Sequence, residues 1–342
     1  MNFVEPEENK KYSEFRNKGR IKKCFYCGGE QNIVTSHSIS ESKCLSPLVE
    51  SVGKNKGIYG FEHLKFRTDE NWFHRDKFGY FELVGINKAS TFKGFCAPHD
   101  QTLFKILDDF HFDRTSAKQK FLYCFRAFAY AYHKKIEREK SCKMESDYKN
   151  NHYMTIQNDL HGIETGLNVD IGNYPHLMKE WLKSEDYIHL THFYCKTKCF
   201  HPIASSCMCE PTFSILGNRI NDYCDIDTPL NHIIINIIPE KECNHTHILV
   251  SAFADQPKSI QFINELEQIY KVNKESFGTF LTTLLVFHTE NTYMSPSMIE
   301  ELPYYTKRNL LLNLRHISTE GIEEELLDKP IRGSLNLFAD VL

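Results

Sequence analysis

The alternation of apolar and polar positions divides the chain into three parts. Residues 1–113 mix turns, short strand patterns and paired cysteine and histidine residues. Residues 114–185 are helical in pattern; 117–140 predicts one long helix, apolar nearly all round in its first half, and 176–183 predicts another. The polar stretch 141–152 between them predicts a linker or exposed loop. We therefore expect an N-terminal cysteine-rich domain (1–113), a helical segment (114–185) and a third domain (186–342).

The third part has the pattern of an α+β domain. Two apolar runs, 232–239 and 246–252, are joined by a short polar turn and predict neighbouring strands that are buried on both faces. Helical patterns follow at 259–271 and 276–288, and Ser295-Pro296 is typical of an N-cap followed by a first-turn proline. The prediction is a mostly antiparallel sheet with covering helices, and its role stays open.

Composition adds few constraints on function. A length of 342 residues favours two or three domains, and a net charge of −4 predicts no particular partner. The apolar run 121–132 is short and contains Arg126, so no membrane span is expected, and the acidic first eight residues are unlike a signal peptide. Twelve cysteines without an export signal indicate reduced thiols and metal sites in a cytoplasmic protein.

The basic run 10–23 predicts either a solvated helix face or a patch that faces phosphates.

Two cysteine-containing turns have the spacing of zinc knuckles. Cys24 and Cys27 form a CxxC pair, followed by two glycines that permit a tight turn. Cys96 and His99 form a CxxH pair at the start of a helical pattern in which Leu103, Phe104, Leu107 and Phe110 share a face. Three cysteines and one histidine suit tetrahedral zinc, so we expect one structural zinc; the alternative is two unrelated pairs. The long separation between the knuckles requires an insertion.

Between the knuckles, residues 35–40 (TSHSIS) carry a single histidine, His37, in a strand pattern. A knuckle, a strand with one histidine and a second knuckle that opens a helix resemble the HNH nuclease family, whose fold is a treble clef with a ββα-metal motif. The resemblance covers about 90 residues, from Cys24 to Phe110. It implies that His37 is the general base, that Asp100 binds a catalytic Mg²⁺ or Mn²⁺, and that Asn87 matches the loop asparagine.

The implied activity is metal-dependent hydrolysis of nucleic acid. Such hydrolysis requires a base that works near neutral pH, which imidazole supplies, and a cation that neutralises charge developing on the phosphate. The resemblance alone also implies an effector of defence against phage, with a protein partner or activator. The strings 87–100 and 288–296 look like a group of uncharacterised bacterial proteins as well.

The chain departs from the family at three positions, and other functions stay open. Ser36 stands where an aspartate that binds the metal is common, Asn87 lies outside the usual place, and His99 replaces the fourth cysteine. His37 could instead be a core or capping histidine, and Asp100 could simply interact favourably with the helix dipole. The alternatives are a non-catalytic zinc module that binds nucleic acid or a protein partner, with a C-terminal sensing or assembly domain, and a purely structural zinc in a protein that acts elsewhere. Ser36 favours both alternatives, whereas the His37 and Asp100 pair favours the nuclease.

The remaining cysteines predict less. Four of them could form a second zinc site if a hairpin joined them, but a CxxxC pair lacks the glycine turn, so half-buried thiols are favoured; they are Cys195, Cys199, Cys207 and Cys209. Five others show no ligand spacing: Cys44, Cys124, Cys142, Cys224 and Cys243. The acidic segment 68–76 predicts an exposed loop.

Overall fold

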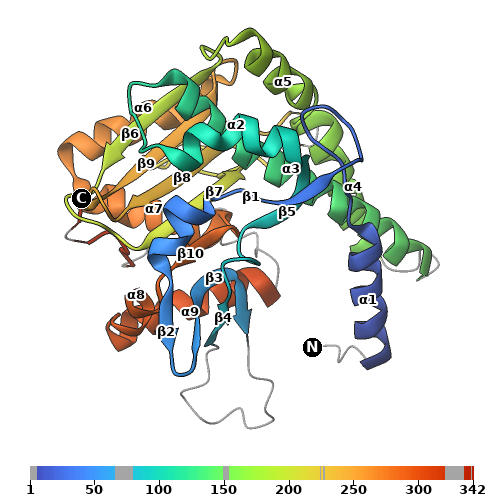
Figure 1. Cartoon of the computed structure of the whole chain (residues 1–342), viewed down its shortest axis with the longest axis horizontal. Helices are drawn as coiled ribbons and strands as arrows, with labels where there is room; N and C mark the ends of the chain where they lie inside the picture. The colour runs from blue at the N-terminus through green and yellow to red at the C-terminus, as the bar shows by residue number, and fades with distance from the viewer. Residues whose placement is uncertain are drawn as a thin grey trace.

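The computed structural model describes residues 6–65, 80–148, 154–223, 225, 228–319, 335–339 and 341–342. The predicted loop 68–76 and Cys224 lie outside these residues. The chain is mixed α+β, and the sheets are antiparallel, as the sequence predicts (Figure 1). In the described part of the chain, no helix combines the length and the apolarity that crossing a bilayer requires.

The described strands form one small and one large sheet. The small sheet pairs β1 (Ile33–His37) with β5 (Thr91–Cys96). The large sheet has the order β2-β3-β10-β7-β8-β9-β6, with β4 paired to β3. Its strands are β2 (Glu50–Val52), β3 (Asn55–Lys65), β4 (Tyr80–Val84), β6 (Leu190–Lys196), β7 (Ile203–Cys209), β8 (Ile233–Glu240), β9 (His245–Phe253) and β10 (Thr292–Met294). The segment between the two knuckles therefore supplies strands to the same sheet as the C-terminal part.

Helices cover both faces of the large sheet because its central strands are apolar on both sides. Along β8, Ile233, Ile235 and Ile237 belong to one core, and Ile234 and Ile238 belong to the other. The second core includes α3 (Ala117–Tyr148), which packs on β7 and β8. The first core includes α6 (Pro257–Val272), α7 (Lys274–His288) and α9 (Tyr304–Thr319). This layering confirms the predicted buried sheet with covering helices.

The remaining helices are α1 (Pro6–Gly19), α2 (Ala97–Asp109), α4 (Met154–Thr165), α5 (Tyr174–Ser184), α8 (Pro296–Glu300) and the short η1 (Glu41–Leu45), η2 (Ser46–Leu48) and η3 (Gly166–Asp170). The strands and helices predicted between residues 232 and 288 are confirmed to within two residues at each end.

Two local predictions are wrong. Residues 141–148 of the predicted linker are instead the last part of α3, because Ser141 and Cys142 are buried, and Ser141 Oγ donates to the carbonyl of Phe15 on α1 at 3.4 Å; residues 149–152 lie outside the described residues. Phe110 does not share the apolar face of α2, because the helix ends at Asp109 and the Phe110 side chain is 61% exposed. Both errors arise at helix ends, where tertiary contacts decide how far the helix continues.

Candidate metal centre

The first knuckle is a closed turn ahead of β1. The Cys24 N–H donates to the Gly29 carbonyl at 2.8 Å, and the Gly28 N–H donates to the Cys24 carbonyl at 2.8 Å. Gly28 has a φ of +73°, a left-handed conformation that side chains beyond glycine rarely adopt, so this turn depends on the first of the two glycines. The second knuckle begins where Cys96 ends β5, and Pro98 in the first turn of α2 suits the helix start.

The structure brings the four predicted zinc ligands together. His99 Nδ1 lies 3.5 Å from Cys24 Sγ and 3.1 Å from Cys96 Sγ, and the ligand atoms of Cys24, Cys27, Cys96 and His99 all lie within 4.8 Å of one another. A tetrahedral zinc with Zn–S of about 2.3 Å and Zn–N of about 2.0–2.1 Å separates its ligand atoms by about 3.3–3.8 Å. The group can therefore hold a metal ion such as zinc.

The metal-free thiols of this group differ in acidity. Burial raises the pKa of Cys24 to about 11. Burial also raises the pKa of Cys27, but hydrogen bonds, first that from the Gly29 N–H, outweigh this effect and lower the pKa overall. Cys27 is exposed and Cys24 is buried. The exposed thiol is therefore the more readily deprotonated of the two, and a cation is needed to hold Cys24 as a thiolate.

Along the chain, the first knuckle is followed by β1, β5 and α2 in that order. In the small sheet Ile33 pairs with Cys96, and His37 pairs with Thr91. The helix α2 packs on both strands, and the rings of Phe95 and Phe104 meet edge to face at 5.0 Å. His37 thus lies at the end of the sheet remote from Cys96, four residues or roughly 13 Å along β1.

Two groups orient the His37 ring at this remote end. Its Nε2 lies 3.0 Å from the Ile86 carbonyl oxygen and 3.4 Å from Glu41 Oε2, and the side chain is 13% exposed. Both neighbours are acceptors, so Nε2 carries the proton and donates it, and in the neutral ring Nδ1 has the lone pair. Nδ1 has no hydrogen-bond partner among the described residues.

A buried polar network fixes the segments on either side of His37 to the large sheet. Ser38 Oγ lies 2.7 Å from Ser90 Oγ and accepts from Asn291 Nδ2 at 2.6 Å. The Ser90 N–H donates to the Tyr293 hydroxyl at 2.7 Å, and the Ile39 N–H donates to Ser90 Oγ at 3.0 Å. The strings 87–100 and 288–296 therefore meet beside β1.

The other predicted catalytic residues lie apart from this network. Asp100 lies in the first turn of α2 next to His99, and its Oδ1 is buried without a hydrogen-bond partner in the described structure. Ser36 is 1% exposed, and its Oγ also lacks a described partner. Asn87 is exposed in the turn that carries Ile86. Among the described residues, neither His37 nor Asp100 belongs to a group of three or more potential metal ligands.

The cysteines of β6 and β7 do not form a second zinc site. Because β8 and β9 lie between β7 and β6, Cys195 is three strand spacings, roughly 14 Å, from the strand that carries Cys207 and Cys209. The hairpin that this alternative needed is therefore absent from the described sheet, and burial raises the pKa of Cys207 to about 12, as expected for an inert thiol.

The sequence interpretation missed one group. Cys243, for which no ligand spacing is visible, lies with His111 and Glu240, and Glu240 also lies with His245 and His247. The H-x-H pattern in β9 is the signal that could have revealed part of the group, since alternate residues of a strand share a face.

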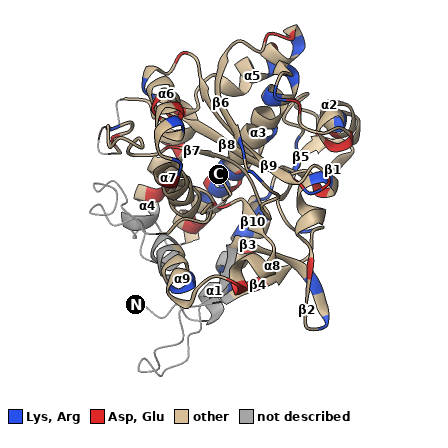
Figure 2. Cartoon of the chain, turned by 90° about the vertical axis from the view of Figure 1, so that its left-hand side faces the viewer, with Lys and Arg blue, Asp and Glu red and all other residues tan. Residues whose placement is uncertain are grey.

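Surface charge does not single out one binding face. The basic residues Lys10, Arg16, Lys18, Arg20, Lys22 and Lys23 are exposed along α1 and the segment before the first knuckle. In the view of Figure 2, lysine and arginine are interspersed with aspartate and glutamate over the helices that face the viewer.

Comparison of the chain with known protein families, with curated proteins and with solved structures finds no significant match.

Proposed function

We propose that the chain hydrolyses nucleic acid with the help of a divalent metal, through an HNH-like treble clef formed by the knuckles, β1, β5 and α2. The observation that carries the proposal is the state of His37. Its Nε2–H is directed to the Ile86 carbonyl and Glu41, which leaves the lone pair of Nδ1 for a proton. A base oriented by a third group is the arrangement that activates a nucleophile such as water.

In this proposal the two metals do different work. Zinc on Cys24, Cys27, Cys96 and His99 is structural, because four protein ligands leave no open position. The family resemblance gives a catalytic Mg²⁺ or Mn²⁺ to Asp100, whose Oδ1 is buried and unpartnered, but Asp100 lies beside the knuckle at the end of the small sheet opposite His37, so the proposal rests on His37. Such an ion neutralises charge that develops on a phosphate. Asn87 follows Ile86, so the asparagine turn lies against the proposed base.

A non-catalytic zinc module that binds nucleic acid or a protein partner is the second candidate. Ser36 replaces the family aspartate and offers a hydroxyl where a carboxylate would bind metal, and no described group of three ligands surrounds His37. The exposed Lys22 and Lys23 beside the first knuckle would serve phosphate contacts in either candidate. A cytoplasmic location and a role in defence against phage complete the proposal, and they rest on the cysteine content and on the family resemblance.

The test is cleavage of DNA and RNA by the full chain with added Mg²⁺ or Mn²⁺. We expect His37→Ala to slow cleavage by about 10²-fold or more, which is the usual contribution of a general base. The matched control is His176→Ala, because His176 is exposed on α5. Zinc content and thermal unfolding of both variants are measured alongside.

Two outcomes count against the nuclease. Cleavage by His37→Ala at the wild-type rate would exclude His37 as the base. Binding of nucleic acid by the wild-type chain without cleavage at any Mg²⁺ or Mn²⁺ concentration would favour the binding module.

A further inference from the structure

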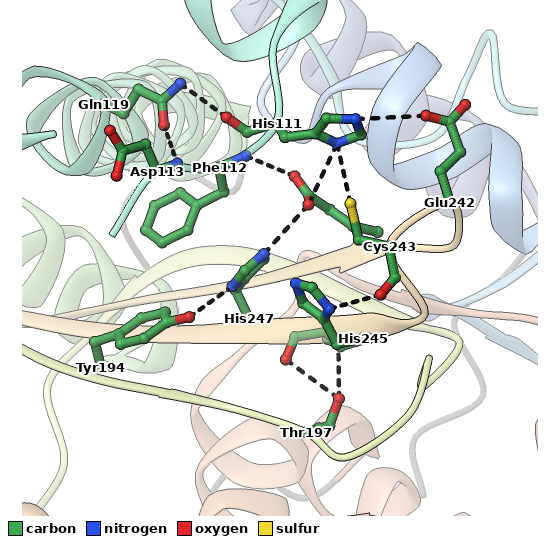
Figure 3. Close-up of polar contacts among 12 residues, drawn as sticks. His111, Phe112, Asp113, Gln119, Tyr194, Thr197, Glu242, Cys243, His245 and His247 are labelled. Atoms are coloured by element: carbon green, nitrogen blue, oxygen red, sulfur yellow. Dashed lines mark hydrogen bonds and ion pairs between the residues drawn. The ribbon is translucent and has the colours of Figure 1, made fainter. Parts of the chain in front are cut away.

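The turn between β8 and β9 gathers five side chains that metals bind in proteins. We call them the Glu240 cluster: His111, Glu240, Cys243, His245 and His247. Glu240 ends β8, Cys243 lies in the turn, His245 and His247 begin β9, and His111 comes from the loop after α2 (Figure 3). Glu240 belongs to both triads of neighbouring ligand atoms, one with His111 and Cys243 and one with His245 and His247.

The spacing of the ligand atoms suits a metal better than hydrogen bonds. Glu240 Oε2 lies 3.4 Å from His111 Nδ1 and 3.3 Å from His247 Nε2, and Cys243 Sγ lies 3.5 Å from His111 Nδ1. The two nitrogen–oxygen distances exceed the usual hydrogen-bond range of about 2.7–3.2 Å. All three match the separations of about 3.3–3.6 Å between neighbouring N, O and S ligands around a tetrahedral zinc.

The histidines of the cluster differ in the partners of their ring nitrogens (Figure 3). His247 Nδ1 lies 2.9 Å from the Tyr194 hydroxyl, and His245 Nδ1 lies 2.8 Å from the Cys243 carbonyl oxygen and donates to it. His111 Nε2 lies 3.6 Å from the Glu242 carboxylate, beyond hydrogen-bond range, whereas His111 Nδ1 faces both Glu240 Oε2 and Cys243 Sγ. Nδ1 is therefore the ring atom that His111 offers to a metal.

Glu240 has one oxygen left for the cluster. Its side chain is 5% exposed, and its Oε1 accepts from the Phe112 N–H at 2.6 Å, so Oε2 is the remaining oxygen. A buried carboxylate needs a compensating partner, and a cation bound at Oε2 would supply positive charge.

The geometry points to a second transition-metal site, in which Glu240 Oε2, His111 Nδ1 and Cys243 Sγ bind a zinc-class divalent cation. Imidazole and thiolate ligands select zinc and its neighbours over Mg²⁺ and Ca²⁺. One carboxylate and one thiolate neutralise the two charges of the ion. This site does not depend on the proposed nuclease function.

A metal at this position would join distant parts of the chain. His111 follows α2, and therefore the knuckle helix, whereas the other ligands belong to the hairpin of the large sheet. An ion bound only by the folded chain stabilises it in proportion to the logarithm of the free metal concentration. We therefore infer that a bound ion holds the segment that follows α2 against the β8–β9 hairpin of the large sheet.

The test is the zinc content of the full chain, measured by elemental analysis after dialysis with Zn²⁺ and then against metal-free buffer. We expect about two zinc ions per wild-type chain, one at the knuckles and one at the Glu240 cluster. The double variant His111→Asn plus Cys243→Ser should retain about one ion and lose the zinc-dependent part of its Tm. Because His111 is 49% exposed and Cys243 is exposed, these substitutions leave the core intact.

The matched control is His176→Asn plus Cys199→Ser, which removes the same residue types from positions outside every described ligand group. The control should keep about two ions per chain. A second variant, Glu240→Gln, should also retain about one ion, and circular dichroism verifies that each variant is folded. A wild-type content of about one ion, or a content of about two that survives both substitutions in the cluster, would overturn the site.

Discussion

Acid should destabilise the protein through histidines that the fold keeps neutral. His201 is the most informative of them because it is buried, and its ring packs against Phe338 at 5.0 Å between centroids. Burial lowers the pKa of His201 from 6.5 to about 4, and burial lowers the pKa values of His192 and His288 in the same direction. We predict that His201→Leu makes stability less dependent on pH.

The magnitude follows from the two pKa values of His201. The unfolded chain takes up a proton below pH 6.5, and the folded chain does so only near pH 4, so stability is complete above 6.5 and falls as the pH decreases towards 4. A shift of this size corresponds to roughly 3 kcal/mol in full. About 2 kcal/mol of it should disappear between pH 7 and pH 5.

The assay is urea unfolding of the wild type and of His201→Leu at pH 7 and at pH 5. The wild type should lose about 2 kcal/mol more than the variant over this interval, because leucine does not titrate. The exposed His176→Asn is the control and should lose as much as the wild type. Equal losses of stability in His201→Leu and the wild type would refute the reasoning. Release of metal by acid does not explain a difference between them, because it affects all three proteins alike.

Two further predictions concern the knuckles and the network beside β1. Cys96→Ser removes a buried candidate ligand and should lower the zinc content, measured by elemental analysis, by about one ion per chain. It should also lower the free energy of unfolding, measured in urea, by more than about 2 kcal/mol. An unchanged zinc content would exclude Cys96 as a ligand. Tyr293→Phe leaves the buried Ser90 N–H without its acceptor and should lower the free energy of unfolding in urea by about 1–3 kcal/mol. The control is Tyr305→Phe, on a 74% exposed side chain, and it should leave the free energy of unfolding unchanged.

The sequence predicts the metal centre well because its signals are local. Each knuckle places two ligands three residues apart, and the zinc chemistry then requires the two pairs to meet, whatever the length of chain between them. The strands 232–239 and 246–252 are predicted for a similar reason, because a short turn forces neighbouring apolar runs to pair. Local spacing carries these predictions without any knowledge of the tertiary fold.

Contacts between distant segments could not be predicted in this way. His111 meets Glu240 because α2 and the β8–β9 turn lie on the same side of the molecule, and no periodicity in the sequence relates these residues. The hairpin between β6 and β7 that a second zinc site would require is absent for the same reason, since these two strands follow each other in sequence but are separated by β8 and β9 in the sheet. Strand order depends on the packing of the whole sheet, which a single sequence does not reveal.

The network beside β1 gives a physical reason for the parts of the strings 87–100 and 288–296 that hold no candidate metal ligand. Asn291 and Tyr293 hold Ser38 and Ser90, which flank the β1 end and the turn around His37. A buried donor that loses its acceptor costs more than the hydrogen bond itself contributes, so these segments constrain each other strongly. The large sheet is therefore part of the support for His37. A fragment of the knuckles, β1, β5 and α2 cut away from β7 and β10 would lose that support, whichever function His37 performs.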